Sequence, residues 1–393
     1  MYMKWRKILS EYPYTKYKNS FVFRLKTILK IILIKNKTNT SRDCSKYKYI
    51  FYIKDFGHLS RALEFKNSIL NHIDINDILI ILNTRHKHTH NKVSENFKNI
   101  MIFSITIDTL GYLKLVYFLV LFLFLNKVKY LIQALNIYEQ GINTYFKQNT
   151  KPLHTNHIQF ISFNDQPIDI SLLLSVFTKN NLLNESIVYQ HGIIALPQFY
   201  FPSKSDIFYA YSQEKKVMDY FSKHNKYNSK LIAVGNLKYQ KKYKEIFLRE
   251  KKNAALIILS PSWKNLFKTL KVIDKSERSS YGFYLRFHPG MKFKRLAKIL
   301  VKSIGLFVDE HNPISFSPYD IIVTEVSTVG FEALAEGYPV AILIDLNYDL
   351  QYYFHSKSLP KINKINIDEL KNAQKHCYTN RKELTIILQN FFG

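Results

Sequence analysis

The chain has 393 residues, with 57 Lys and Arg against 30 Asp and Glu, which gives a formal net charge of +27. A hydrophobic content of 47% with 22% charged residues excludes a disordered chain, and the length favours two domains over a single core. The charge suits nucleic acid, an anionic membrane surface or an anionic small substrate, but no RNP-like pattern, zinc-finger spacing or basic heptad region supports dedicated nucleic-acid recognition.

Two cysteines, Cys44 and Cys377, are too few for a disulfide scaffold or a cysteine-based metal site, and they suit a reducing cytosol. The N-terminal stretch "MYMKWRKILSEYPY" has neither the continuous apolar core nor the small-residue cleavage site of a secretory signal. We therefore expect a cytoplasmic protein.

Two apolar stretches with basic flanks indicate contact with a membrane surface. Residues 21–37, "FVFRLKTILKIILIKNK", have helical spacing, and the apolar run Leu115–Leu125 lies between Lys114 and Lys127. This run has eleven residues, whereas a membrane-spanning helix needs about 20. One interpretation is a buried core helix. The other is a membrane-facing helix near 113–126 that attaches the protein peripherally to the inner face of the cytoplasmic membrane, with its lysines among anionic headgroups.

Short apolar runs alternate with helical patterns along the chain. The runs of the first half cover 47–53, 77–83, 99–105, 158–165, 185–192, 206–212 and 230–236. Those of the second half cover 255–261, 281–290, 305–310 and 319–328, followed by a helix and strand at 331–345 and a polar helical tail. Such alternation predicts mainly parallel, doubly wound sheets, an α/β fold.

A lysine-rich segment at 237–253, "LKYQKKYKEIFLREKKN", separates two such units. We predict four parts: a basic helical segment at 1–45, a Rossmann-like domain at 46–240, a second Rossmann-like domain at 252–365 and a C-terminal helix at 366–393. Two doubly wound domains facing each other across a cleft place the ligand outside the carboxyl ends of their strands.

The motif "LRFHPG" ends a strand of the second domain with Arg286 and His288. Pro289 restricts the preceding residue to an extended backbone, so the imidazole of His288 emerges at the strand tip. There it can donate to a phosphate oxygen or protonate a leaving group. The alternative is a surface histidine before a turn.

The motif "VSTVGFEALAEG" places Ser327 and Thr328 at a predicted helix start, followed by Gly330 and, about one turn in, Glu332. Free backbone N–H groups and hydroxyls at a helix N-terminus bind phosphate, and Glu332 can reach a ribose hydroxyl pair. The alternative is an ordinary N-cap, in which the hydroxyls bond to the helix's own amides.

The motif "SIVYQHGII" ends a strand of the first domain with His191, and Gly192 lets a ligand or another chain segment approach closely. The alternative is a core histidine bonded to a backbone carbonyl. Other candidates for a general base or an acceptor contact are Asp55, His58, Asp165 and Gln190, each of which can equally be a turn or cap residue.

The order of these motifs resembles that of bacterial GT-B glycosyltransferases of surface-polysaccharide assembly. A His-Pro followed by a Ser/Thr pair is shared with bacterial sialyltransferases, polysialyltransferases and Kdo transferases, and the resemblance covers residues 185–345. It implies that 46–240 is the acceptor domain, that 252–365 is the nucleotide-sugar-binding domain, and that His288, Ser327 and Thr328 hold the phosphate and ribose of a CMP-sugar. The sialyltransferases carry an acidic pair where this chain has Gln190-His191-Gly192, which leaves His191 and the carboxylates Asp165 and Asp55 as candidates for the catalytic base.

The resemblance implies transfer of a nonulosonic acid or Kdo to a cell-surface glycan or lipid-linked precursor. No Asp-x-Asp pair is present, and Arg286, histidines and a helix N-terminus can stabilise the leaving phosphate, so we expect no metal and no cofactor besides the sugar donor. Two alternatives remain. One is a CDP-glycerol or CDP-ribitol polyol-phosphate transferase of the teichoic type, and the other is a non-catalytic scaffold of a polysaccharide assembly complex.

Overall fold

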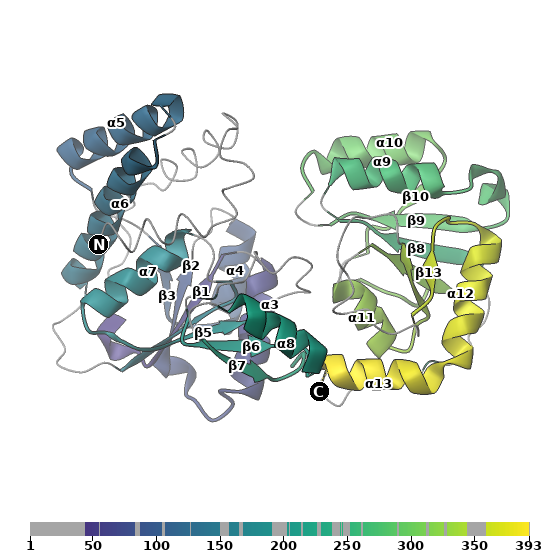
Figure 1. The fold of residues 1–393 in the computed structure, drawn as a ribbon, viewed down its shortest axis with the longest axis horizontal. Coiled ribbons are helices and arrows are strands. Elements are labelled where there is room, and N and C mark those ends of the chain that lie inside the picture. The colour runs from purple at the N-terminus through teal and green to yellow at the C-terminus, as the bar shows by residue number, and fades with distance from the viewer. Residues whose placement is uncertain are drawn as a thin grey trace. The chain divides into compact units, whose positions relative to one another are not determined.

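The computed structural model describes residues 44–54, 56–82, 87–103, 107–125, 127–149, 157–164, 168–190, 203, 205–213, 215–225, 229–237, 244, 246, 252–260, 262–288, 291–311, 314–325, 328–343 and 359–392. These residues form two compact units, each built around one sheet (Figure 1). The basic stretch predicted at 21–37 lies outside the described residues.

The first unit contains a seven-stranded sheet with the strand order β3-β2-β1-β4-β5-β6-β7. Its strands are β1 (Tyr49–Ile53), β2 (Ile78–Leu82), β3 (Ile100–Ile102), β4 (Ile158–Ser162), β5 (Leu183–Tyr189), β6 (Ile207–Ala210) and β7 (Lys230–Ala233). Its helices are α3 (Phe56–Ser68), α4 (Lys87–Asn96), α5 (Thr109–Leu125), α6 (Val128–Asn149) and α7 (Ile168–Lys179). Helix α8 (Lys215–His224) follows β6 in the chain and is divided between the two units. The pairs from β3 through β6 are parallel, and the strand order reverses between β1 and β4.

The second unit contains a six-stranded parallel sheet with the order β10-β9-β8-β11-β12-β13. Its strands are β8 (Ala254–Ile258), β9 (Gly282–Arg286), β10 (Phe307–Val308), β11 (Ile321–Thr324), β12 (Val340–Leu343) and β13 (Lys361–Ile362). Its helices are α9 (Trp263–Val272), α10 (Lys294–Ser303), α11 (Thr328–Ala335), α12 (Ile367–Thr379) and α13 (Arg381–Phe392). The order reverses between β8 and β11, and α9 and α10 lie on the opposite side of this sheet from α11 (Figure 1).

The prediction of doubly wound parallel sheets is confirmed. Every residue of β2, β8, β11 and β12 is buried, as expected where helices cover both faces of a sheet, and this explains why these strands read as continuous apolar runs. The short strand β13 was not predicted. The tail expected as one helix forms two, because α12 ends at its C-cap residue Asn380 and α13 begins directly after it.

The apolar run predicted near 113–126 forms α5, which packs beside α6 (Figure 1). One face of α5 is buried, whereas the opposite face is exposed, so the helix is neither wholly core nor wholly surface. Within the described part of the chain, no helix combines the length and the hydropathy needed to cross a membrane.

Helix α11 lies unusually close to strand β11. A Cβ placed on Gly330 would lie 2.7 Å from Thr324 Cγ2 and 3.3 Å from Thr324 Cβ. Because both residues are buried, neither has room to move away, and glycine allows the backbone of α11 to approach the end of its own strand.

We expect Gly330→Ala to lower the free energy of unfolding by about 1 kcal/mol, because overpacking outweighs the gain in helix propensity. Urea denaturation measures this change. The matched test is the same substitution in a Thr324→Ser background, which removes the clashing methyl group and should reduce the penalty. An equal penalty in both backgrounds would show that this contact does not require the glycine.

Candidate functional site

The carboxylate of Glu325 connects the two strands at which the second sheet reverses its order. Glu325 directly follows β11 and is only 1% exposed. One oxygen accepts hydrogen bonds from the backbone N–H of Ser260 at 3.1 Å and from Asn265 Nδ2 at 3.2 Å, and the other accepts from Thr269 Oγ1 at 3.0 Å. A single charged group after β11 thereby holds the turn after β8 and the first two turns of α9.

The N-terminus of α9 is fixed at the carboxyl end of β8 by a second set of bonds. Ser262 is the N-cap residue, and its hydroxyl accepts from the backbone N–H of Asn265. Asn265 Nδ2 also donates to Ser260 Oγ at 2.7 Å. The positive end of a helix is therefore held where the sheet order reverses, which is where doubly wound folds bind ligands and where a phosphate is favoured.

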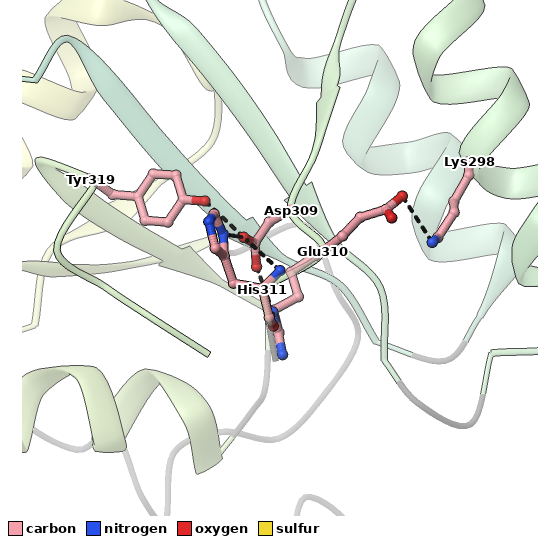
Figure 2. A network of polar contacts seen from close by, with 6 residues as sticks. Lys298, Asp309, Glu310, His311 and Tyr319 are labelled. Atoms are coloured by element: carbon pink, nitrogen blue, oxygen red, sulfur yellow. Dashed lines mark hydrogen bonds and ion pairs between the residues drawn. The ribbon is translucent and has the colours of Figure 1, made fainter. Parts of the chain in front are cut away.

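A second network surrounds the buried carboxylate of Asp309, which directly follows β10 (Figure 2). Arg286 Nη1 contacts Asp309 Oδ2 at 2.5 Å and also donates to the carbonyl of His311 at 2.7 Å. On the other oxygen of Asp309, His311 Nδ1 lies at 2.5 Å and Tyr319 Oη donates at 2.9 Å. The neighbouring Glu310 points the other way and pairs with Lys298 at 2.9 Å (Figure 2).

These partners set the protonation states of the network. Burial alone would raise the pKa of Asp309, but hydrogen bonds from His311, Arg286 and Tyr319 hold it below its usual value. The pKa of Tyr319 is raised, first by burial and then by its hydrogen bond to Asp309. Asp309 is thus the anion of the network and Tyr319 a neutral donor.

Basic side chains gather near the end of β9. Lys294, at the start of α10, is half-buried, and its pKa is lowered by burial and by the charges of Lys298 and Arg286. The indole Nε1 of Trp263 on α9 donates to the carbonyl of Lys292 at 3.0 Å, which ties the start of α9 to the turn before α10. Part of this positive charge is offset, because Arg286 pairs with Asp309 and Lys298 pairs with Glu310.

The first unit has a different constellation at the carboxyl ends of β1 and β4, where its sheet reverses. The backbone N–H of Lys54 donates to His58 Nδ1 at 3.4 Å, so a neutral His58 carries its proton on Nε2. The buried ring of His58 lies 5.4 Å from that of Phe163, which follows β4. In a separate contact, the hydroxyl of Tyr52 on β1 donates to Asp169 Oδ2 at 2.5 Å, at the start of α7. The ring of Tyr52 is fully buried against Phe103 and Phe160.

Six of the predicted site residues fall outside the described residues: Asp55, Asp165, His191, Gly192, Pro289 and Ser327. Gln190 is buried directly after β5, and His58 is buried on α3. Thr328 begins α11, and Gly330 and Glu332 are buried within that helix.

The two predicted residues at the end of β9 differ in their surroundings. Arg286 is the last residue of β9 and forms the ion pair with Asp309. His288 is exposed, and its carbonyl accepts from the backbone N–H of Met291 at 3.0 Å, which closes a turn. Because β9 lies beside β8, both residues reach the same edge of the sheet as the start of α9.

The residues that build these sites were not predicted from the sequence. Glu325, Asn265 and Thr269 were not named, although Glu325 is the acidic residue that directly follows the buried strand β11. Asp309 and Tyr319 were also missed. Tyr52 and Asp169 are 117 positions apart, and no local pattern signals their contact.

No protein-family model and no curated protein matches this sequence. Solved structures do resemble it. HepE from Anabaena, solved with UDP and glucose, aligns with a TM-score of 0.50 and 11% identity over 88% of this chain and 96% of its own. UDP-N-acetylglucosamine 2-epimerase from Rickettsia bellii aligns with a TM-score of 0.51 and 10% identity over 88% and 94%. At this identity the likeness shows the fold alone, which is GT-B-like with two parallel Rossmann-like sheets.

We expect Glu325→Gln to lower the free energy of unfolding by about 2–3 kcal/mol, because an amide accepts fewer of the three buried hydrogen bonds. The matched control is Glu310→Gln, which alters an exposed ion pair with Lys298 and should leave the stability nearly unchanged. Chemical denaturation of both variants compares them directly. Equal stabilities would contradict the role of Glu325 as the connection between β11 and α9.

The Asp309 network predicts a specific pH dependence. The folded pKa of Asp309 lies below its unfolded value of about 3.9. The stability that the ionised carboxylate contributes is therefore present above that pH and is lost as the pH falls through the folded pKa. Asp309→Asn should therefore be less stable than the wild type by about 2–4 kcal/mol at pH 7, and the difference should shrink in acid. Denaturation at several pH values tests this, and a constant difference down to pH 3 would contradict it.

Proposed function

We propose that the protein is a glycosyltransferase that uses a nucleotide-linked sugar. The observation that carries this proposal is the N-terminus of α9, held by Glu325 where the second sheet reverses its order. The basic residues Arg286 and Lys294 at the end of the neighbouring strand support a phosphate at this edge.

The donor in this proposal is a CMP-linked sugar, a nonulosonic acid or Kdo. The support is the motif order, with His288 exposed at the tip of β9 and Thr328 at the start of α11. In the reaction, an acceptor hydroxyl oxygen forms a bond to the anomeric carbon, and the bond from that carbon to the phosphate oxygen of CMP breaks. The acceptor proton passes to a base, for which His191, Asp165, Asp55 and His58 are the candidates.

The second unit would act on the leaving group and the first on the acceptor. Negative charge grows on the CMP phosphate as the glycosidic bond breaks, and a fixed helix N-terminus with nearby cations stabilises that charge without reorganisation. The acceptor is a cell-surface glycan or its lipid-linked precursor. The same proposal puts the enzyme at the inner face of the cytoplasmic membrane, where such precursors are available.

A thermal-shift titration with CMP, CDP, UDP, UMP, GDP and ADP tests the donor. Because a ligand that binds only the folded protein stabilises it by about 2.7 kcal/mol at 100 times its Kd, CMP should raise the Tm clearly. His288→Ala should weaken this shift while leaving the unliganded Tm unchanged, since the side chain is exposed. His72→Ala, another exposed histidine, is the control and should leave the shift intact.

Each other outcome changes the proposal in a defined way. A shift with CDP but not CMP would favour transfer of a polyol phosphate, and analysis of the product for a new phosphodiester would decide. A shift with UDP or GDP alone would overturn the CMP donor. No shift with any nucleotide would favour a non-catalytic scaffold.

A further inference from the structure

The outer face of α5 carries a continuous stripe of exposed apolar side chains. Its members are Leu110 (60% exposed), Leu113 (61%), Tyr117 (58%), Val120 (43%) and Phe124 (71%). They follow one another at intervals of three and four residues, so they lie on one face of the helix. At 1.5 Å per residue, the stripe is about 20 Å long.

This stripe is presented by a helix that is firmly anchored on its other side. Leu115, Leu119, Phe122 and Leu123 of α5 are buried and belong to the same core cluster as residues of α6 and α7. The exposed side chains are therefore a second apolar face on a helix whose core-facing positions are already filled. An exposed apolar face of this extent on a protein surface indicates a binding site.

The charges beside the stripe are mainly positive. Residues 109–138, which cover α5 and the first half of α6, contain no Asp or Glu, and the exposed Asp108 directly precedes α5 and accepts a hydrogen bond from the backbone N–H of Gly111. They contain Lys114, Lys127 and Lys129, all three of which are exposed. Tyr112 and Tyr117 on the exposed part of α5 have the combination of ring and hydroxyl that suits a membrane–water interface.

We infer that the outer face of α5 docks onto a lipid bilayer that contains anionic headgroups. The apolar stripe enters the boundary between headgroups and acyl chains, and the three lysines contact lipid phosphates. The three lysines outnumber the one nearby carboxylate, Asp108, so the charge around the stripe favours an anionic lipid surface. A second copy of the chain is the other occupant that the experiment distinguishes.

This inference rests on the membrane location in the proposed function and assigns that contact to α5, but it uses no residue of the nucleotide site. Lipid binding and nucleotide binding are measured separately, so a failure of docking is distinguished from a failure of the proposed sugar transfer.

The experiment uses the full chain with a single labelled cysteine. Both native cysteines, Cys44 and Cys377, are buried and should not label in the folded protein. Leu113→Cys and Phe124→Cys place an environment-sensitive fluorophore on the stripe, and Ile386→Cys places it on α13 at a comparably exposed position (54%) as the matched control. Vesicles contain either equal parts of phosphatidylglycerol and phosphatidylcholine or phosphatidylcholine alone.

We expect anionic vesicles to shift the emission of both stripe labels to the blue and to leave the α13 label unchanged. Replacing Lys114, Lys127 and Lys129 by Gln should weaken the vesicle affinity on the order of tenfold or more. Equal binding to phosphatidylcholine alone would overturn the anionic assignment.

Two other results would overturn docking to a bilayer itself. Stripe labels that are already blue-shifted without vesicles, with a dependence on protein concentration, would show that a second copy covers α5. The same signal without a concentration dependence would show that another part of this chain, such as residues 21–37, covers it.

Discussion

The second unit depends on one buried carboxylate. Glu325 has almost no contact with water, and its charge is balanced by three hydrogen-bond donors from the β8–α9 turn and from α9. A buried charge without such donors is costly, so the turn and the helix must take up this arrangement when the sheet forms. Since β8 and β11 are the strands between which the sheet order reverses, the same bonds that stabilise the unit also shape its ligand-binding edge.

The two sheets reverse in the same way but present different chemistry at that point. The second unit offers a helix N-terminus with Arg286 and Lys294 nearby, which suits an anion. The first offers the imidazole of the buried His58, which suits proton transfer, whereas Tyr52 is fully buried in the core and donates to Asp169. Under the proposed function, the donor phosphate belongs to the second unit and the acceptor hydroxyl to the first.

The fold could be predicted from the sequence because strands covered on both faces are continuous apolar runs. The runs at 77–83 and 255–261 contain β2 and β8, in which every residue is buried. The exposure of α5 could not be predicted in this way, because its hydropathy is nearly uniform around the helix, and only packing against α6 decides which face is covered.

The candidate site could be predicted only in part, and for a physical reason. His288 and Thr328 were located because strand ends and helix starts have local signals. Glu325, Asp309 and Asp169 act through partners that are distant in sequence: Thr269 is 56 positions from Glu325, and Tyr52 is 117 from Asp169. Such pairs exist only after the strands are placed side by side.

Hydrogen exchange, measured by mass spectrometry with and without saturating CMP, tests the central claim most directly. If the nucleotide binds where the second sheet reverses, peptides covering the β8–α9 and β11–α11 turns should exchange more slowly with CMP bound, and the far ends of the same strands should not change. Protection confined to the first unit, or no protection in either turn while CMP binds, would contradict this account.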